Sequence, residues 1–99
     1  MAYQLIRRPT NNKILEFKLI SYESKRERVT KRTIAKWISN GTHLQIAYGK
    51  RLGCRVYAIR EAVDTETFII TAPAVSIKVE RDRKVIIDAE DGIYTLQLT

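Results

Sequence analysis

The sequence predicts an α+β domain: an antiparallel sheet or partly open barrel of six to eight short strands, with one amphipathic helix at about residues 30–40 packed on it. Apolar and polar residues alternate along most of the chain, which is the pattern of half-buried strands. Only one stretch has the three- and four-residue apolar spacing of a helix. The length of 99 residues suits one domain with a modest core, so residues 1–99 are expected to form a single unit.

The chain is predicted to begin with a β-hairpin. Tyr3–Arg8 and Lys13–Tyr22 read as two strands, and Pro9–Asn12 between them is rich in turn-forming residues. Leu15 and Phe17 alternate with charged residues and would form the apolar face of the second strand.

The helix is predicted from its apolar face and its C-terminal signal. Ile34, Trp37 and Ile38 recur at the spacing of one helix face. Gly41 follows Asn40 at a position where helices commonly end in a left-handed residue. The sequence therefore specifies the end of the helix near Asn40.

Two starts of this helix compete. A long helix would begin after Ser24, which forms a capping box with Glu27. A short helix would begin after Thr30, which would act as its N-cap. The β-branched side chains of Val29, Thr30 and Thr33 favour the short helix, because such residues are poor helix formers.

The chain after the helix is predicted to be strands joined by polar turns. Asp64–Thr67 is expected to form a turn, and Pro73 is expected to end a strand because it lacks an N–H for the ladder. A glycine-flanked loop is expected at Gly49–Gly53. The strands are predicted at His43–Tyr48, Arg55–Val63, Phe68–Ala72 and Val75–Val79, followed by a last hairpin around Asp91-Gly92.

The last hairpin has a predicted register. Asp91-Gly92 is a favoured pair for a two-residue turn of the primed type. Such a turn would place Ala89 opposite Tyr94 and Ile87 opposite Leu96. One face of the hairpin would then be entirely apolar, with Val85, Ile87, Ala89, Tyr94, Leu96 and Leu98 on it.

Charge is unevenly distributed along the chain. Residues 1–60 carry fourteen Lys and Arg against three carboxylates, a net of +11, whereas residues 61–99 carry four against eight, a net of −4. The densest segment, Lys25–Lys36, has six cations and one carboxylate. This concentration predicts a positive field that attracts an acidic partner.

The geometry of the basic segment depends on where the helix starts. The long helix would align Lys25, Arg28, Arg32 and Lys36 on its outer face, where each can neutralise a backbone phosphate. The short helix would put Lys31 and Arg32 in its first turn, where the helix dipole disfavours positive charge and a bound anion would remove the penalty. The residues predicted to bind nucleic acid or another polyanion are Lys25, Arg26, Arg28, Lys31, Arg32 and Lys36, with Lys50, Arg51 and Arg55 as a second group near the glycine-flanked loop.

No catalytic or metal site is predicted, so the chain is expected not to be an enzyme and to need no cofactor. His43 is the only histidine and Cys54 the only cysteine, which is too few for a His/Cys metal cluster. Cys54 is expected to be a small, half-buried strand residue. Asp88, Glu90 and Asp91 are assigned to the last turn and to a polar face opposite a basic partner or the chain's own basic helix.

Three segments carry a resemblance to a known family. Leu5–Arg8, Ile14–Leu19 and Ile34–Gly41 give two strands and a short helix ending in I-x-x-G, and another strand follows. In this order the first sixty residues resemble a family of short uncharacterised bacterial and phage domains. The resemblance implies a small prokaryotic or mobile-element protein and supplies no functional residues. The basic segment departs from the family, in which a more acidic helix is expected, and the last forty residues lie outside the match.

The sequence therefore predicts a small cytoplasmic module that contacts the DNA or RNA backbone through the Lys25–Lys36 region, without sequence specificity. The alternative is a protein-interaction or inhibitor module, borne by a phage or mobile element, that docks on an acidic surface of a host complex. No membrane partner is expected, because no apolar run approaches the ~20 residues of a membrane span. The lone Cys54 favours a reducing compartment. The charge split leaves open a homo-oligomer formed by charge complementarity.

Overall fold

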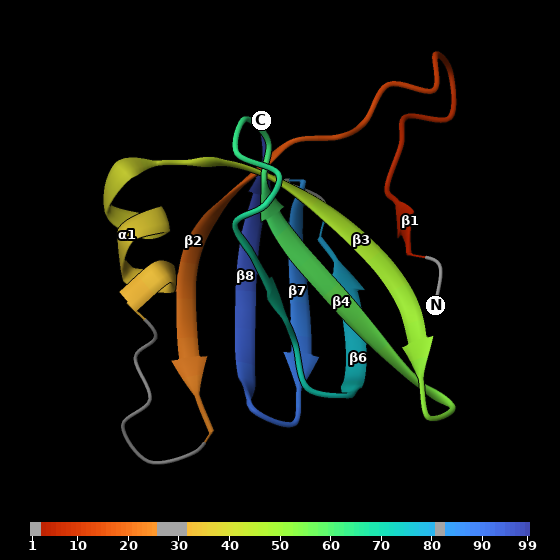
Figure 1. The fold of residues 1–99 in the computed structure, drawn as a ribbon, viewed down its shortest axis with the longest axis vertical. Helices are drawn as coiled ribbons and strands as arrows, with labels where there is room; N and C mark the ends of the chain where they lie inside the picture. Colours follow the sequence, from red (N-terminus) through yellow and green to blue (C-terminus); the bar gives the residue numbers. More distant parts are fainter. Residues whose placement is uncertain (1–2, 26–31, 81–82) are drawn as a thin grey trace.

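The computed structural model describes residues 3–25, 32–80 and 83–99 (Figure 1). This part of the chain forms a small α+β domain with eight strands and one helix, at the upper end of the predicted number of strands. Its elements are β1 (Gln4–Leu5), β2 (Phe17–Ser24), α1 (Arg32–Asn40), β3 (His43–Arg51), β4 (Cys54–Glu61), β5 (Phe68–Ile70), β6 (Ala74–Val79), β7 (Lys84–Ala89) and β8 (Gly92–Leu98).

The strands join into one antiparallel sheet that is open rather than closed. Their order is β5-β4-β3-β2-β8-β7-β6, and β1 pairs with β3 outside this path. The sheet curls, so that β3 and β4 cross in front of β7 and β8, while α1 lies beside β2 (Figure 1). The predicted antiparallel sheet with one packed helix is confirmed, in its open form.

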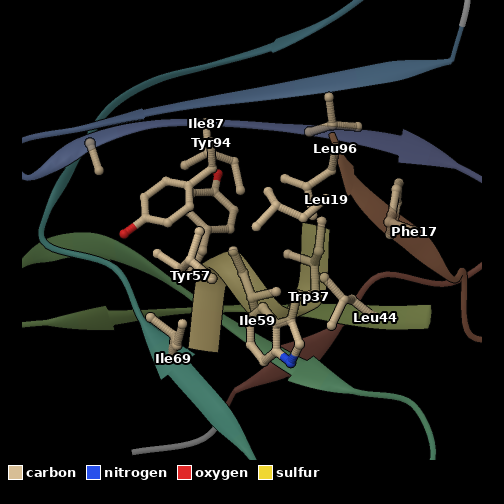
Figure 2. Close-up of a cluster of buried hydrophobic side chains, with 14 residues drawn as sticks. Phe17, Leu19, Trp37, Leu44, Tyr57, Ile59, Ile69, Ile87, Tyr94 and Leu96 are labelled. Carbon is tan, nitrogen blue, oxygen red and sulfur yellow. The ribbon is translucent and has the colours of Figure 1, made fainter. Parts of the chain in front are cut away.

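The hydrophobic core fills the space inside the curled sheet. Ile87, Tyr94 and Leu96 come from β7 and β8, and Ile59 faces them from β4 (Figure 2). Trp37 of α1 reaches the same cluster, and all five side chains are buried. Trp37 therefore anchors α1 to the sheet, which explains why the helix carries its apolar residues at helical spacing.

The predicted end of α1 is confirmed. Ile34 and Trp37 are buried, whereas Ile38 at the edge of the same face is 38% exposed. Gly41 has a φ of 59°, and its N–H donates to the Ile38 carbonyl at 3.4 Å. The Thr42 N–H donates to the Trp37 carbonyl at 3.2 Å, which completes a Schellman motif.

The long version of the helix is wrong. Ser24 belongs to β2 and pairs with Gly92 of β8, and Lys25, the predicted first residue of the long helix, is not helical. The Lys25 N–H then donates to the Asp91 carbonyl at 3.1 Å, which continues the path of the strand. The ladder with β8 therefore extends to the position where the long helix was predicted to begin. Thr30, the N-cap of the favoured short helix, lies outside the described residues.

The predicted opening hairpin is present only as a short ladder. Arg7 forms a bridge with Ile14, and the Arg8 N–H donates to the Lys13 carbonyl at 2.7 Å. β1 pairs with β3, whereas β2 pairs mainly with β8. The ladder with β8 places the apolar face of β2 on the core, which a purely local hairpin could not do.

The last hairpin has the predicted faces but not the predicted register. Ile87 pairs with Tyr94 rather than with Leu96, a shift of two residues. Because the side-chain period of a strand is two, this shift leaves each side chain on its predicted face. That face is buried except for Leu98, which is half-buried.

Asp91 and Gly92 do not form the predicted two-residue turn, and Gly92 has a different role. Neither residue has the positive φ that a primed turn requires. Gly92 instead packs against β2, where an added Cβ would lie 2.6 Å from Cε1 of Tyr22 and 2.7 Å from the Glu23 carbonyl oxygen. The glycine is needed at this position for space and not for its backbone conformation.

The Asp64–Thr67 turn is present as predicted. The Thr67 N–H donates to the Asp64 carbonyl at 3.1 Å, and the Thr67 hydroxyl donates to Oδ2 of Asp64 at 2.7 Å. The predicted strands on either side correspond to β4 and β5, each ending two residues earlier than predicted.

Candidate nucleic-acid interface

The end of the β3–β4 hairpin is a free two-stranded ribbon. β1 pairs with β3 only as far as Tyr48, and β5 pairs with β4 only from Ala58. The last residue pairs of the hairpin join Gly49–Arg51 to Cys54–Val56, and no third strand of the described chain pairs beside them. All residues of Lys50–Arg55 are exposed, and the hairpin end projects beyond the rest of the sheet (Figure 1). We call Lys50–Arg55 the basic arm.

The turn of the basic arm is shorter than the predicted Gly49–Gly53 loop. Arg51 pairs directly with Cys54, so only Leu52 and Gly53 form the turn. Their φ values are 52° and 80°, and two positive φ values in succession are the requirement of a type I′ turn. The strands therefore continue almost to the tip because this turn matches their twist.

The cations of the basic arm lie on both faces of the ribbon. Lys50 and Arg55 are paired across the strands and share one face, whereas Arg51 points to the other face. No Asp or Glu occurs between Glu27 and Glu61 in the sequence. No carboxylate of the described residues forms an ion pair with these three side chains. The arm is therefore a region of uncompensated positive charge.

Arg55 is held by an aromatic ring. Its guanidinium carbon lies 5.6 Å from the centre of the Tyr48 ring, within the range of a cation–π contact. The Tyr48 hydroxyl donates to Oε1 of Gln4 in β1 at 2.9 Å. This chain of contacts links the root of the arm to the N-terminal strand and restricts the conformations of Arg55.

Two cations of the predicted Lys25–Lys36 group are on α1, away from the basic arm. Arg32 and Lys36 are one helical turn apart, and both are exposed. In Figure 1, α1 and the end of the β3–β4 hairpin lie on opposite sides of the molecule. Arg26, Arg28 and Lys31 lie outside the described residues. The structure thus separates the predicted cations into two surfaces.

Lys25 was predicted to join the row of cations on the long helix, but it lies neither on α1 nor in the basic arm. It follows β2 instead of beginning a helix, so the predicted row of four helical cations is wrong. Its Nζ forms an ion pair with Oδ1 of Asp88 in β7. An intramolecular carboxylate therefore offsets this charge, although Lys25 is not part of the basic helix that was expected to face the acidic residues.

Two features of the basic arm could not be predicted from the sequence. Leu52 is at the tip of the turn and 97% exposed. Leu-Gly is not one of the favoured turn pairs, so the sequence does not indicate a two-residue turn here. The contact of Arg55 with Tyr48 depends on the strand register, which local patterns did not specify. The only available signal was the pair of glycines, Gly49 and Gly53, around three residues of which two are cations.

His43 and Cys54 are not arranged for catalysis together. They lie at opposite ends of the β3–β4 hairpin, so the nine residues of β3 separate them by about 26 Å. Nδ1 of His43 is 2.9 Å from Oε1 of Glu16, and both side chains are near half-exposed. Cys54 is exposed rather than half-buried as predicted, because it lies at the free end of the ribbon.

The acidic residues of the last turn have structural contacts. The Tyr94 hydroxyl donates to Oδ2 of Asp91 at 2.9 Å, and the Tyr22 hydroxyl donates to the Asp91 carbonyl at 3.2 Å. Burial, followed by the hydrogen bond to Asp91, raises the pKa of the Tyr94 hydroxyl above its ordinary range. In the part of the chain that is described, no group of three His, Cys, Asp or Glu side chains could hold a metal ion.

A mainly apolar groove is lined by residues outside the basic arm and α1. It has a volume of about 300 Å³, and its apolar lining includes Ile6, Leu15 and Phe17 together with Ile77 and Val79 of β6. Glu80 and Arg83 are the charged residues of its lining, and their charges are opposite, so the groove adds no net charge to the candidate interface.

Comparison with protein-family models, with curated proteins and with solved structures finds no match to this chain. The resemblance of the first sixty residues to short bacterial and phage domains therefore stays a prediction. Within residues 3–25, 32–80 and 83–99, no helix is both long and apolar enough to cross a membrane.

Proposed function

We propose that this chain is a small binding module that contacts the nucleic-acid backbone without sequence specificity. The observation that supports this function best is the basic arm, in which Lys50, Arg51 and Arg55 have no carboxylate partner among the described residues. Cations that neutralise phosphates release condensed counterions, which supplies most of the free energy of non-specific binding.

The distribution of these cations suits a phosphate backbone. Lys50 and Arg55 extend from one face of the ribbon and Arg51 from the other, so an arm lying in a groove can reach phosphates on both sides. Contacts of this kind fix position and carry no sequence information. Arg32 and Lys36 on α1 form a separate basic surface for a second, weaker contact.

The test is the salt dependence of binding to mixed-sequence duplexes, measured by fluorescence anisotropy. The logarithm of the association constant should fall linearly with the logarithm of the salt concentration. Replacing Lys50 and Arg51 by Gln should reduce the slope by about 2, because two phosphate contacts are lost. The matched control replaces Lys13 and Lys18 by Gln, which removes the same charge from exposed positions outside the arm.

A control pair that weakens binding as much as the arm pair would show that net charge alone is responsible. An affinity that does not respond to salt would contradict the proposal. Capture of one defined acidic protein after nuclease treatment, without salt-dependent binding to DNA or RNA, would favour the protein-interaction alternative.

The structure also bears on the cellular compartment and on self-association. Cys54 is a free, exposed thiol, which suits a reducing compartment such as the cytoplasm. Self-association through charge complementarity has less support, because Asp88 already pairs with Lys25 of the same chain.

A further inference from the structure

Leu52 has a backbone conformation that its residue type disfavours. A φ of 52° is in the left-handed region, where the Cβ of an L-residue crowds the following carbonyl oxygen. Type I′ turns accordingly favour Asn, Asp or Gly at this position. The side chain is 97% exposed, so packing cannot compensate for the strain. A residue that is strained and makes no stabilising packing contact indicates a functional constraint.

The exposed apolar side chain of Leu52 lies among the cations of the basic arm. Arg51 precedes it, and Lys50 of β3 pairs with Arg55 of β4 just behind the turn. Gly53 makes the turn possible because residues with a Cβ rarely adopt its φ of 80°. A Cβ added there would meet no atom within 4 Å, so the space around the turn is open. The tip is therefore narrow, and one large apolar side chain is its outermost group.

We infer that the partner is double-helical DNA and that Leu52 is a wedge that enters between base pairs from the minor groove and bends the duplex. This inference rests on the proposed function, since the cations of the arm must first engage the phosphates. Proteins that bind the minor groove frequently insert an apolar side chain between base steps, which unstacks them and kinks the helix. Cations on both faces of the ribbon then hold the phosphates on either side of the groove.

Other partners fit the tip less well. A single-strand binder stacks bases on exposed aromatic rings, and the nearest ring, Tyr48, is already covered by Arg55. A membrane surface would need more apolar area than one Leu side chain, because even a single acyl chain gives only marginal membrane binding. A wedge between base pairs needs only one side chain.

The inference is tested by energy transfer between dyes at the two ends of a short mixed-sequence duplex. The wild-type protein should shorten the distance between the dyes on binding. Leu52→Asn keeps every cation and supplies a residue that this turn prefers. It should lose the bend, keep the salt slope, weaken affinity about three- to tenfold and raise the Tm by about 4 °C.

Two variants serve as controls. Leu52→Met retains a long apolar side chain and should keep the bend. Val63→Asn removes another side chain that is 97% exposed, beyond the opposite end of β4, and should change neither bending nor affinity. Together they separate a wedge at the tip from a general effect of exposed apolar area.

The inference is overturned if Leu52→Asn bends the duplex as the wild type does, or if the wild type binds without bending. In both cases persistent salt-dependent binding leaves the proposed function standing. Absence of any binding to DNA or RNA overturns both. A lower Tm for Leu52→Asn would assign Leu52 a structural role. Leu52-dependent binding to vesicles containing phosphatidylserine, without bending of DNA, would assign the tip to a membrane surface.

Discussion

The guanidinium of Arg55 lies over the ring of Tyr48, with 5.6 Å between the guanidinium carbon and the ring centre. The two residues are diagonal neighbours on one face of the β3–β4 ribbon, at the point where the free end begins. Tyr48 is fixed in turn by its hydrogen bond to Gln4. Arg55 is therefore less free to rotate than Lys50 beside it, and less conformational entropy is lost when it binds a phosphate.

This relationship predicts different effects for two substitutions of Tyr48. Tyr48→Phe keeps the ring and loses only the bond to Gln4, so affinity for duplex DNA should change by less than about twofold. Tyr48→Leu removes the cation–π contact, about 0.5–1 kcal/mol at an exposed site, and should weaken affinity about two- to fivefold. A double-mutant cycle with Arg55→Gln measures the coupling. Additive effects of Tyr48→Leu and Arg55→Gln would contradict this explanation.

The sequence allowed the elements to be predicted, but not which strands pair over long distances. Alternating polarity identified the faces of β7 and β8 correctly, because a register shift of two residues preserves every face. The turn signal of Asp91-Gly92 was misleading, since Gly92 is required by Tyr22, a residue 70 positions earlier in the chain. Local patterns cannot contain that information.

For the candidate site, the sequence identified the cations but not their arrangement or their partners within the chain. The sequence identifies the cations, and the structure describes Lys50, Arg51 and Arg55 on one arm. It does not reveal which cations are neutralised within the chain, because the partner of Lys25 is Asp88, 63 residues away. The strain at Leu52 also depends on the hairpin register, which places this residue in the turn.

The close approach at Gly92 predicts a large effect of one methyl group. Gly92→Ala would bring a Cβ to 2.7 Å from the backbone oxygen of Glu23 and 2.6 Å from the Tyr22 ring, so β2 and β8 must separate locally. The expected loss of unfolding free energy is about 1–3 kcal/mol, measured by urea denaturation. Gly53→Ala has space but an unfavourable φ, and should cost about 1–2 kcal/mol. An unchanged urea midpoint for Gly92→Ala would show that the strands accommodate the methyl group.

The ion pair of Lys25 with Asp88 predicts that this lysine contributes little to nucleic-acid binding. Lys25→Gln should leave the salt slope nearly unchanged, whereas Lys50→Gln should reduce it by about 1. Asp88→Asn should free the Lys25 charge and raise the affinity at low salt. Each change should alter stability by less than about 1 kcal/mol, because the side chains are about one-third exposed. A Lys25→Gln effect as large as that of Lys50→Gln would place Lys25 in the interface.

The buried contact between Tyr94 and Asp91 predicts a loss of stability at alkaline pH. Burial and the neighbouring carboxylate raise the pKa of Tyr94 in the folded state, because a phenolate there would be poorly solvated and repelled by Asp91. In the unfolded state the pKa returns to its ordinary value of about 10. Below that pH both states keep the proton, so the contribution of Tyr94 to stability is complete.

Above pH ~10 the unfolded state releases the proton before the folded state does, so the free energy of unfolding falls by up to about 1.4 kcal/mol per pH unit from this group. Urea denaturation at a series of alkaline pH values should show this decline in the wild type. Tyr94→Phe cannot ionise, so it should be less stable near neutral pH, where it lacks the bond to Asp91, and the gap between the two proteins should narrow as the pH rises above 10. A constant gap would mean that Tyr94 ionises equally in both states, and that its hydroxyl is more accessible to water than its burial indicates.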